Sequence, residues 1–352
     1  MKKAVLLIAL ALGSATAFAQ KIDKNEMKQL KAFLEQPAEK GGTNAQALKI
    51  VDMNSPATWE GVTVAGGHVT AIDWKDKKLS GDLNLAGFSQ LSKVDVSRNK
   101  IKTLSVANDA ALTNLNASRN AITTIDLAGT GALETVNIYR NRLTEFNIEG
   151  SRSIQNLNVS NNYLVGLDVA NATALKTLNC QGNHLENLMV NGCTGLKNLY
   201  AGYNKLKSIN LFGVESLSNL NIDDNEISSM IISGLPSLST FICSDNNMTT
   251  LAMRNCNALL DLVCSYNDLT SLSVETCPNL LYVDCSYNDL TSLTLSNQTF
   301  LQRLICNNNQ LNILDVSFDQ ALTYINCRYN TITDFRTIGC DNLHMVACQW
   351  NY

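Results

Sequence analysis

Residues 260–280 read LDLVCSYNDLTSLSVETCPNL and contain one full period of the repeat that decides the fold. A hydrophobic residue recurs every 21 positions, without insertion, from Val94 to Val346. An asparagine stands five positions after each of these residues, from Asn99 to Asn351. A fixed period of this length predicts a stack of short coils, each of which contacts only its neighbours.

Each coil contains one segment that alternates like a β-strand. Counting the recurring residue as position 0, as for Leu262, apolar residues also occupy positions +2, +7, +10, +12 and +18. The alternation predicts that positions 0 and +2 point inward and that −1, +1 and +3 point to solvent. Adjacent coils then form a parallel sheet with about 4.8 Å between strands. The asparagine at +5 ends the strand, where its amide can bond backbone groups that a turn leaves unpaired.

This pattern resembles the leucine-rich repeat family, and its 21-residue form with cysteine in the strand resembles the bacterial internalin-like proteins. The match covers residues 72–352. The resemblance implies an α/β solenoid, which is a right-handed superhelix of about 13–14 coils with a parallel sheet on its concave face and a helical N-terminal cap. Because one such scaffold carries many ligands, the resemblance does not name the ligand.

Residues 1–19 are predicted to be a cleaved secretory signal. Two lysines precede the apolar run from Ala4 to Leu12, and small residues follow at Ala17 and Ala19. The alternative is an N-terminal anchor, but the run is too short to span a bilayer. We therefore expect an exported protein without a membrane span, either secreted, held at the cell surface or periplasmic.

Residues 20–71 are predicted to form the N-terminal cap, and residues 72–352 the repeat domain. The segment from Lys24 to Gln36 places its apolar residues on one face of a helix that shields the first coil: Met27, Leu30, Phe33 and Leu34. The first coil, Ile72 to Leu91, has one extra residue, and Lys77 replaces its asparagine. Terminal repeats commonly diverge in this way.

The eleven cysteines follow the phase of the repeat. Seven occupy the inward position +2: Cys180, Cys243, Cys264, Cys285, Cys306, Cys327 and Cys348. We interpret them as a ladder of buried free thiols, because other coils carry valine, alanine or isoleucine there. The other four occupy position +15, which is predicted to be partly exposed because it also carries aspartate: Cys193, Cys256, Cys277 and Cys340. Cys256 and Cys277 lie in adjacent coils, so a disulfide between them is an alternative.

Neither a catalytic site nor a cofactor is predicted. His68, His184 and His344 fall in different columns of the repeat, whereas a catalytic triad needs groups within hydrogen-bond reach. No Cys-x-x-Cys pair gives the spacing of a zinc site. Four carboxylates crowd two adjacent turns, and we interpret them as solvated rather than as a calcium site: Asp223, Asp224, Glu226 and Asp245.

Charge is distributed unevenly along the chain. Residues 20–142 hold 16 Lys+Arg and 13 Asp+Glu, a balance of 16 − 13 = +3. Residues 143–352 hold 9 and 18, a balance of 9 − 18 = −9. Arg98, Arg119 and Arg140 share position +4 and form an expected basic ladder, which is either solvated or a contact for an anionic glycan. An exported chain of net charge −4 is not expected to bind nucleic acid.

The outward positions of the predicted concave sheet change character halfway along. Early coils carry almost only polar residues at −1 and +1, whereas later coils carry aromatic and aliphatic residues at −1, +1 and +4. A contiguous run of this kind is typical of protein and sugar interfaces, and packing across the sheet is the alternative. The predicted ligand-binding residues are Tyr200, Tyr203, Ile242, Val263, Tyr266, Tyr282, Tyr287, Ile305, Tyr324, Tyr329 and Trp350.

These features predict a non-enzymatic binding module that recognises a protein or glycan ligand, with adhesion as one such role. The alternative is a structural protein that assembles end to end. The last strand, from Val346 to Trp350, is expected to leave an open backbone edge, and such an edge can pair with a second copy to form a homodimer.

Overall fold

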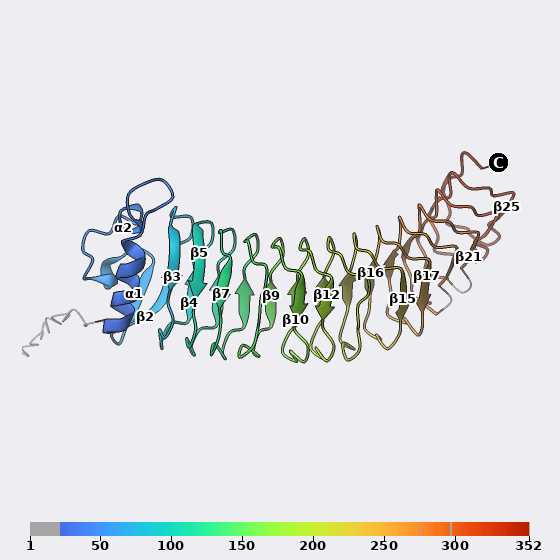
Figure 1. Ribbon diagram of the computed structural model, residues 1–352. Helices are drawn as coiled ribbons and strands as arrows, with labels where there is room; N and C mark the ends of the chain where they lie inside the picture. Colours follow the sequence, from blue (N-terminus) through green and yellow to red (C-terminus); the bar gives the residue numbers. More distant parts are fainter. Residues whose placement is uncertain (1–21, 275, 296–297, 352) are drawn as a thin grey trace, which may run out of the picture.

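The protein forms a long, curved solenoid in the computed structural model, which describes residues 22–274, 276–295 and 298–351 (Figure 1). The predicted signal of residues 1–19 lies outside the described residues. Within the described ranges, no helix is both long and apolar enough to cross a membrane.

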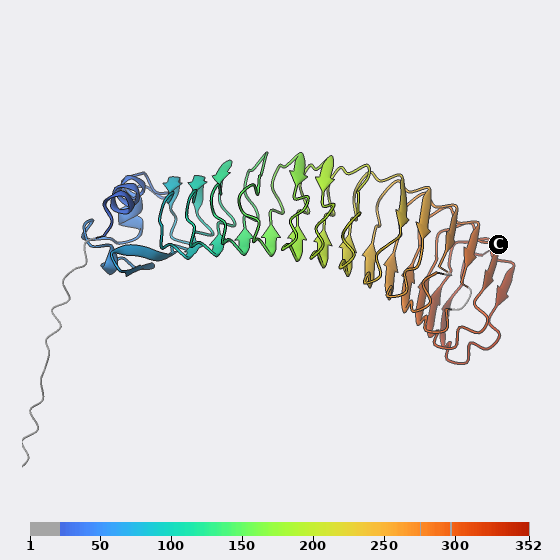
Figure 2. The same cartoon turned by 90° about the horizontal axis from the view of Figure 1, so that it is seen from below.

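A 15-stranded sheet runs along the inner side of the curve (Figure 2). It starts with an antiparallel hairpin of β1 (Val62–Ala65) and β2 (His68–Asp73), and β2 then pairs in parallel with β4. The parallel strands, one per coil, are β4 (Lys93–Asp95), β6 (Asn114–Asn116), β8 (Thr135–Asn137), β9 (Asn156–Asn158), β11 (Thr177–Asn179), β13 (Asn198–Tyr200), β14 (Asn219–Asn221), β16 (Thr240–Ile242), β18 (Asp261–Val263), β20 (Tyr282–Asp284), β22 (Arg303–Ile305), β24 (Tyr324–Asn326) and β26 (Met345–Ala347). Each covers positions −1, 0 and +1, and the register pairs Leu262 with Phe241 on one side and Val283 on the other. The predicted concave sheet is therefore confirmed.

A second, interrupted row of strands lies on the outer side of the curve (Figure 2). It consists of β3 (Ser80–Asn84), β5 (Lys100–Ser105) and β7 (Thr124–Asp126), followed by the pairs β10 (Gly166–Asp168) with β12 (Asn187–Met189), β15 (Ser229–Ile232) with β17 (Thr250–Met253), β19 (Ser271–Ser273) with β21 (Ser292–Thr294), and β23 (Ile313–Asp315) with β25 (Asp334–Arg336). The expectation of a single strand per coil is incomplete, because the apolar positions +10 and +12 also alternate and support a second strand.

An N-terminal helix covers the first coil, as predicted. The helical elements are α1 (Lys24–Leu34), α2 (Asn44–Ala47) and a short 3₁₀ turn (Pro56–Thr58). Asp23 caps α1 by accepting hydrogen bonds from the first-turn amides. Leu30, Phe33 and Leu34 are buried, and the ring of Phe33 stacks on Trp74 with 5.8 Å between centroids. The limits 20–71 and 72–352 for cap and repeat domain stay a prediction.

The asparagine ladder fastens each coil to its neighbour. Asn267 Nδ2 donates to the carbonyl oxygens of Cys264 at 3.2 Å and of Cys243, in the preceding coil, at 3.1 Å. Its Oδ1 accepts the backbone N–H of Met248 at 3.0 Å. Asn246 makes the same contacts one coil earlier, with its Oδ1 accepting the amide of Ile227. The predicted role of the +5 amide is confirmed.

Position +4 turns the chain through the left-handed region in every coil from Arg98 to Trp350, with Gly182 the one glycine among them. This turn buries the preceding position: Ser244 and Ser265, at +3, are each 7% exposed, and their hydroxyls lie 2.9 Å apart. The prediction that +3 points to solvent is therefore wrong for the coils with serine there, because the chain folds back over it, whereas Arg328 is half-buried and Gln349 is exposed.

All eleven cysteines are free thiols, and the +2 ladder is buried except for the exposed Cys348. Among the described residues, no later coil covers Cys348. The expectation of partly exposed cysteines at +15 is wrong: Cys193, Cys256, Cys277 and Cys340 are all buried. Two of these thiols donate to a carbonyl of the preceding coil: Cys193 Sγ to Val169 at 3.0 Å and Cys340 Sγ to Val316 at 2.8 Å.

Candidate functional site

The predicted ligand-binding residues occupy three columns of the concave face: −1 and +1 within the strands, and +4 on the turn after each strand. The residues at −1 and +1 are half-buried between neighbouring strands: Tyr200, Ile242, Val263, Tyr282, Ile305 and Tyr324. The residues at +4 form the aromatic row and are 44–57% exposed: Tyr203, Tyr266, Tyr287, Tyr329 and Trp350. None of the eleven is fully buried, so each can reach a ligand.

The structure brings part of the aromatic row together. Tyr266 and Tyr287 stack with 4.3 Å between ring centroids and 8° between planes. Tyr329 and Trp350 stack with 4.6 Å and 5°. Tyr203 is separated from them, because the two intervening coils carry aspartate at +4. The stacked +4 residues therefore lie in the last five coils rather than in the whole second half, and Asn308 separates the two stacked pairs.

The aromatic row sits on a backbone conformation that bulky residues seldom adopt. Tyr266 has φ 52° and Tyr287 has φ 54°, whereas other coils place Asn161 or Gly182 at the same position. Glycine and asparagine enter this region at lower cost than an aromatic residue. Stacking of two rings contributes about 0.5–1.5 kcal/mol and can offset that cost, but the turn itself does not need tyrosine.

Arg303 completes the surface, although the sequence patterns did not single it out. Its Cζ lies 5.7 Å from the ring centroid of Tyr282 and 5.2 Å from that of Tyr324, within the range of cation–π attraction. The Tyr282 hydroxyl donates to Asp284 at 3.4 Å. Burial, with the nearby carboxylate of Asp284, raises the pKa of Tyr282, so its hydroxyl stays protonated as a donor. The signal in the sequence was one arginine between two tyrosines of the same column.

The early half of the concave face is polar, and some of its side chains contact one another across coils. Asn116 Nδ2 donates to Asp95 at 3.0 Å. Within the expected basic ladder, Arg119 lies over the ring of Tyr139 at 5.3 Å. Such bonds between neighbouring coils use part of the hydrogen-bonding capacity of the polar half.

The three histidines lie far apart from one another and have separate contacts. His68 Nδ1 contacts the buried carboxylate of Glu26 at 2.8 Å, His184 stacks near Tyr163, and His344 contacts the backbone of its own turn. In the acidic turns, burial and the neighbouring carboxylate raise the pKa of Asp223. Over the part of the chain that the structure describes, no group of three His, Cys, Asp or Glu residues could hold a metal ion.

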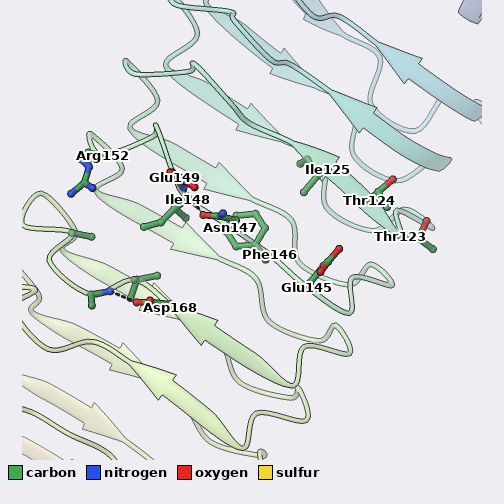
Figure 3. Close-up of a pocket in the computed structure, with 13 residues that line it drawn as sticks. Thr123, Thr124, Ile125, Glu145, Phe146, Asn147, Ile148, Glu149, Arg152 and Asp168 are labelled. Atoms are coloured by element: carbon green, nitrogen blue, oxygen red, sulfur yellow. Dashed lines mark hydrogen bonds between the residues drawn. The ribbon is translucent and has the colours of Figure 1, made fainter.

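A cavity of about 720 Å³ opens on the outer side of the solenoid, between β7 and β10 (Figure 3). Phe146 and Ile148 line it together with the charged residues Glu145, Arg152 and Asp168. Among the described residues, no backbone hydrogen bond joins residues 145–150 to either neighbouring strand, so the outer sheet is interrupted here. The sequence patterns did not predict this cavity; the aromatic Phe146 at +10, a position that is aliphatic in the adjoining coils, is the signal that accompanies it.

A 21-residue coil, a parallel concave sheet, an asparagine ladder and a cysteine column together define a leucine-rich repeat solenoid. Its fold is similar to the functional domain of InlJ from Listeria monocytogenes, which includes a cysteine ladder: the TM-score is 0.56 at 22% identity, over 75% of this chain and 66% of that one. It is also similar to the leucine-rich repeat protein LIC12759 of Leptospira interrogans (TM-score 0.65, 20% identity, 89% of this chain and 88% of that one) and to YopM, a leucine-rich effector protein from Yersinia pestis (0.62, 24%, 75% and 73%). No protein-family model and no curated protein sequence matches the chain. The predicted resemblance to bacterial internalin-like solenoids is confirmed at the level of the fold.

Proposed function

We propose that the chain is an exported, non-enzymatic binding module that holds a protein or glycan ligand against the aromatic half of its concave sheet, with adhesion as one such role. The observation that carries the proposal is the aromatic row, in which five large aromatic residues are 44–57% exposed on left-handed turns. The turn does not require aromatic residues, so folding alone does not explain them. Exposed aromatic residues grouped on one surface are typical of a binding site.

The chemistry of this surface suits an interface. Tyrosine and tryptophan combine a large apolar area with a polar tip and dominate the energy of many protein and sugar interfaces. The stacked pairs, Tyr266 with Tyr287 and Tyr329 with Trp350, hold their rings in place before a ligand arrives. Rings that are already ordered lose less conformational entropy on binding.

The proposal is tested by capturing ligands from bacterial surface extracts and from host-cell extracts. The bait proteins are the wild type, a Tyr266→Ala/Tyr287→Ala variant and an Asn116→Ala/Asn137→Ala control from the polar half. A ligand retained by the wild type and the control but lost by the tyrosine variant supports the proposal. A ligand that the tyrosine variant retains and the asparagine variant loses assigns binding to the other half of the face.

Self-association through the C-terminal coil is the second candidate function. Val346 is 37% exposed, whereas its equivalents Ile325 and Leu304 are fully buried. An apolar strand edge of this kind can pair with a second copy of the chain. Light scattering at high micromolar concentration should then give the mass of a dimer, and a monomeric mass counts against this candidate.

A further inference from the structure

Three consecutive coils repeat one arrangement of side chains at two positions of the concave sheet. At position −1, strands β20, β22 and β24 carry, in order, Tyr282, Arg303 and Tyr324. At position +4, the same coils carry, in order, Tyr287, Asn308 and Tyr329. Both columns have tyrosines on the outside; the middle residue is an arginine in one and a short amide in the other.

Position −1 shows what fits between two such tyrosines. Strands two coils apart are separated by about 9.6 Å, which is twice the strand spacing. The guanidinium of Arg303 occupies this interval, 5.7 Å from one ring centroid and 5.2 Å from the other. Both distances lie within the range of about 6 Å for attraction between a cation and a ring face.

Position +4 also has two flanking tyrosines, but the residue between them is the short Asn308. One face of Tyr287 is covered by Tyr266 and one face of Tyr329 by Trp350, so the other face of each ring is turned along the row towards Asn308. The two tyrosines are 44% and 47% exposed. The asparagine side chain is shorter than a tyrosine and forms the floor between them. We call this space, bounded by Tyr287, Asn308 and Tyr329, the +4 slot.

We propose that the +4 slot binds the guanidinium group of an arginine side chain from a protein ligand. The inference rests on the proposed function and names the partner chemistry of that same surface. A planar guanidinium stacks on aromatic faces and is weakly hydrated, whereas the ammonium of lysine is compact and strongly hydrated. The balance of −9 over residues 143–352 favours a cationic group over an anionic one.

The neighbourhood of the slot can accept a positive charge. Two arginines lie nearby, and both already have partners: Arg303 of the same coil lies between Tyr282 and Tyr324, and Arg328 of the following coil donates through Nε to Gln349, a further coil away from Asn308. The Asn308 side chain has a carbonyl oxygen that can accept an N–H bond from a bound guanidinium. Its own backbone N–H is already bonded to the carbonyl of Arg328 at 2.9 Å, so the floor of the slot is fixed.

The test compares hexa-arginine with hexalysine by titration calorimetry on the full chain. Two variants carry the same added charge at equivalent positions: Asn308→Arg fills the slot from below, and Asn161→Arg lies in the polar half. Asn308 and Asn161 have φ 55° and 54°, and the chain already places Arg98 and Arg119 on such turns. Both variants are therefore expected to fold.

The wild type and Asn161→Arg are expected to bind hexa-arginine at least about tenfold more tightly than hexalysine, and Asn308→Arg to lose that preference. Equal affinity for the two peptides, binding of neither, or the same loss in both variants overturns the inference. The proposed function is judged separately by the captured ligand. The tyrosine variant could lose that ligand while the wild type binds hexa-arginine and hexalysine equally. That result would support the proposed binding surface and contradict the arginine slot.

Discussion

The carboxyl group of Asp109 accepts the backbone N–H of Phe88, in the preceding coil, at 2.7 Å, and neither residue is exposed. The second carboxyl oxygen is buried without a hydrogen-bond partner among the described residues. Burial raises the pKa of Asp109 to about 8, and burial also raises the pKa of Asp319, its equivalent near the other end, to about 7. Both acids are therefore protonated in the folded protein at mildly acidic pH.

These acids make stability depend on pH. The unfolded chain loses the proton of an aspartic acid near pH 4, whereas folded Asp109 keeps it until about pH 8. Their contribution to stability is therefore complete below about pH 4, and Asp109's share is lost as the pH rises through about 8. Urea unfolding should show that the free energy of unfolding declines between pH 5 and 8. The decline should be shallower in Asp109→Asn than in the wild type, by up to about 1.4 kcal/mol per pH unit. Parallel declines in both proteins would contradict this assignment.

The cysteine ladder predicts a characteristic reactivity. Only a thiolate reacts with an aromatic disulfide reagent, and burial raises the pKa of Cys180 to about 12. Cys348 is the exposed thiol. We expect one thiol to react in the native protein and eleven after unfolding without a reductant. Several fast thiols in the native state, or fewer than eleven in the unfolded state, would show that the ladder is open or oxidised.

The interruption of the outer sheet predicts fast local exchange. Val169 and Asn171 donate to the next coil at 2.9 and 3.0 Å, while the equivalent amides of Ile148 and Gly150 make no such bond in the described structure. Hydrogen exchange followed by mass spectrometry should show residues 145–150 exchanging at least about tenfold faster than residues 166–171. Equal protection of the two segments would mean that the outer ladder is closed in solution.

Two adjacent residues should affect stability to different extents. Asn267→Ala leaves the buried N–H of Met248 without its acceptor and removes one of the two asparagine donors from each of the carbonyls of Cys243 and Cys264, so a loss of roughly 2–5 kcal/mol is expected. Tyr266→Ala removes an exposed ring and one stacking contact, so a change below about 1.5 kcal/mol is expected. Chemical denaturation of the two variants measures both values. Similar losses would mean that the aromatic row holds the fold together.

The sequence predicts the inner half of each coil well, because the residues that build it recur in fixed columns. Leu262 marks the buried strand and Asn267 the turn, and both behave as expected. The left-handed turn at +4 was missed because arginine, tyrosine and aspartate occupy it more often than glycine does. Because this turn was missed, Ser265 at +3 was predicted to be exposed, whereas it is buried.

Features that depend on contacts between columns were beyond the sequence patterns. The eleven candidate residues were found by column, but their division into stacked pairs depends on ring orientation. Arg303 enters the surface only because two rings flank it. The cavity beside Phe146 lies where the outer segment of one coil does not pair with its neighbours. A repeat pattern describes what the coils share, so it does not predict an exception in a single coil.

The central claim is that the aromatic row binds the ligand, and its most direct test is a comparison of dissociation constants for the captured ligand. The three proteins are the wild type, a Tyr266→Ala/Tyr287→Ala/Tyr329→Ala variant and an Asn116→Ala/Asn137→Ala/Asn158→Ala control. Because interface anchors cost about 2 kcal/mol or more each, the tyrosine variant should bind at least about 100-fold more weakly. The asparagine control should stay within about threefold of the wild type. Wild-type affinity in the tyrosine variant, with weakened binding in the asparagine control, would contradict the claim.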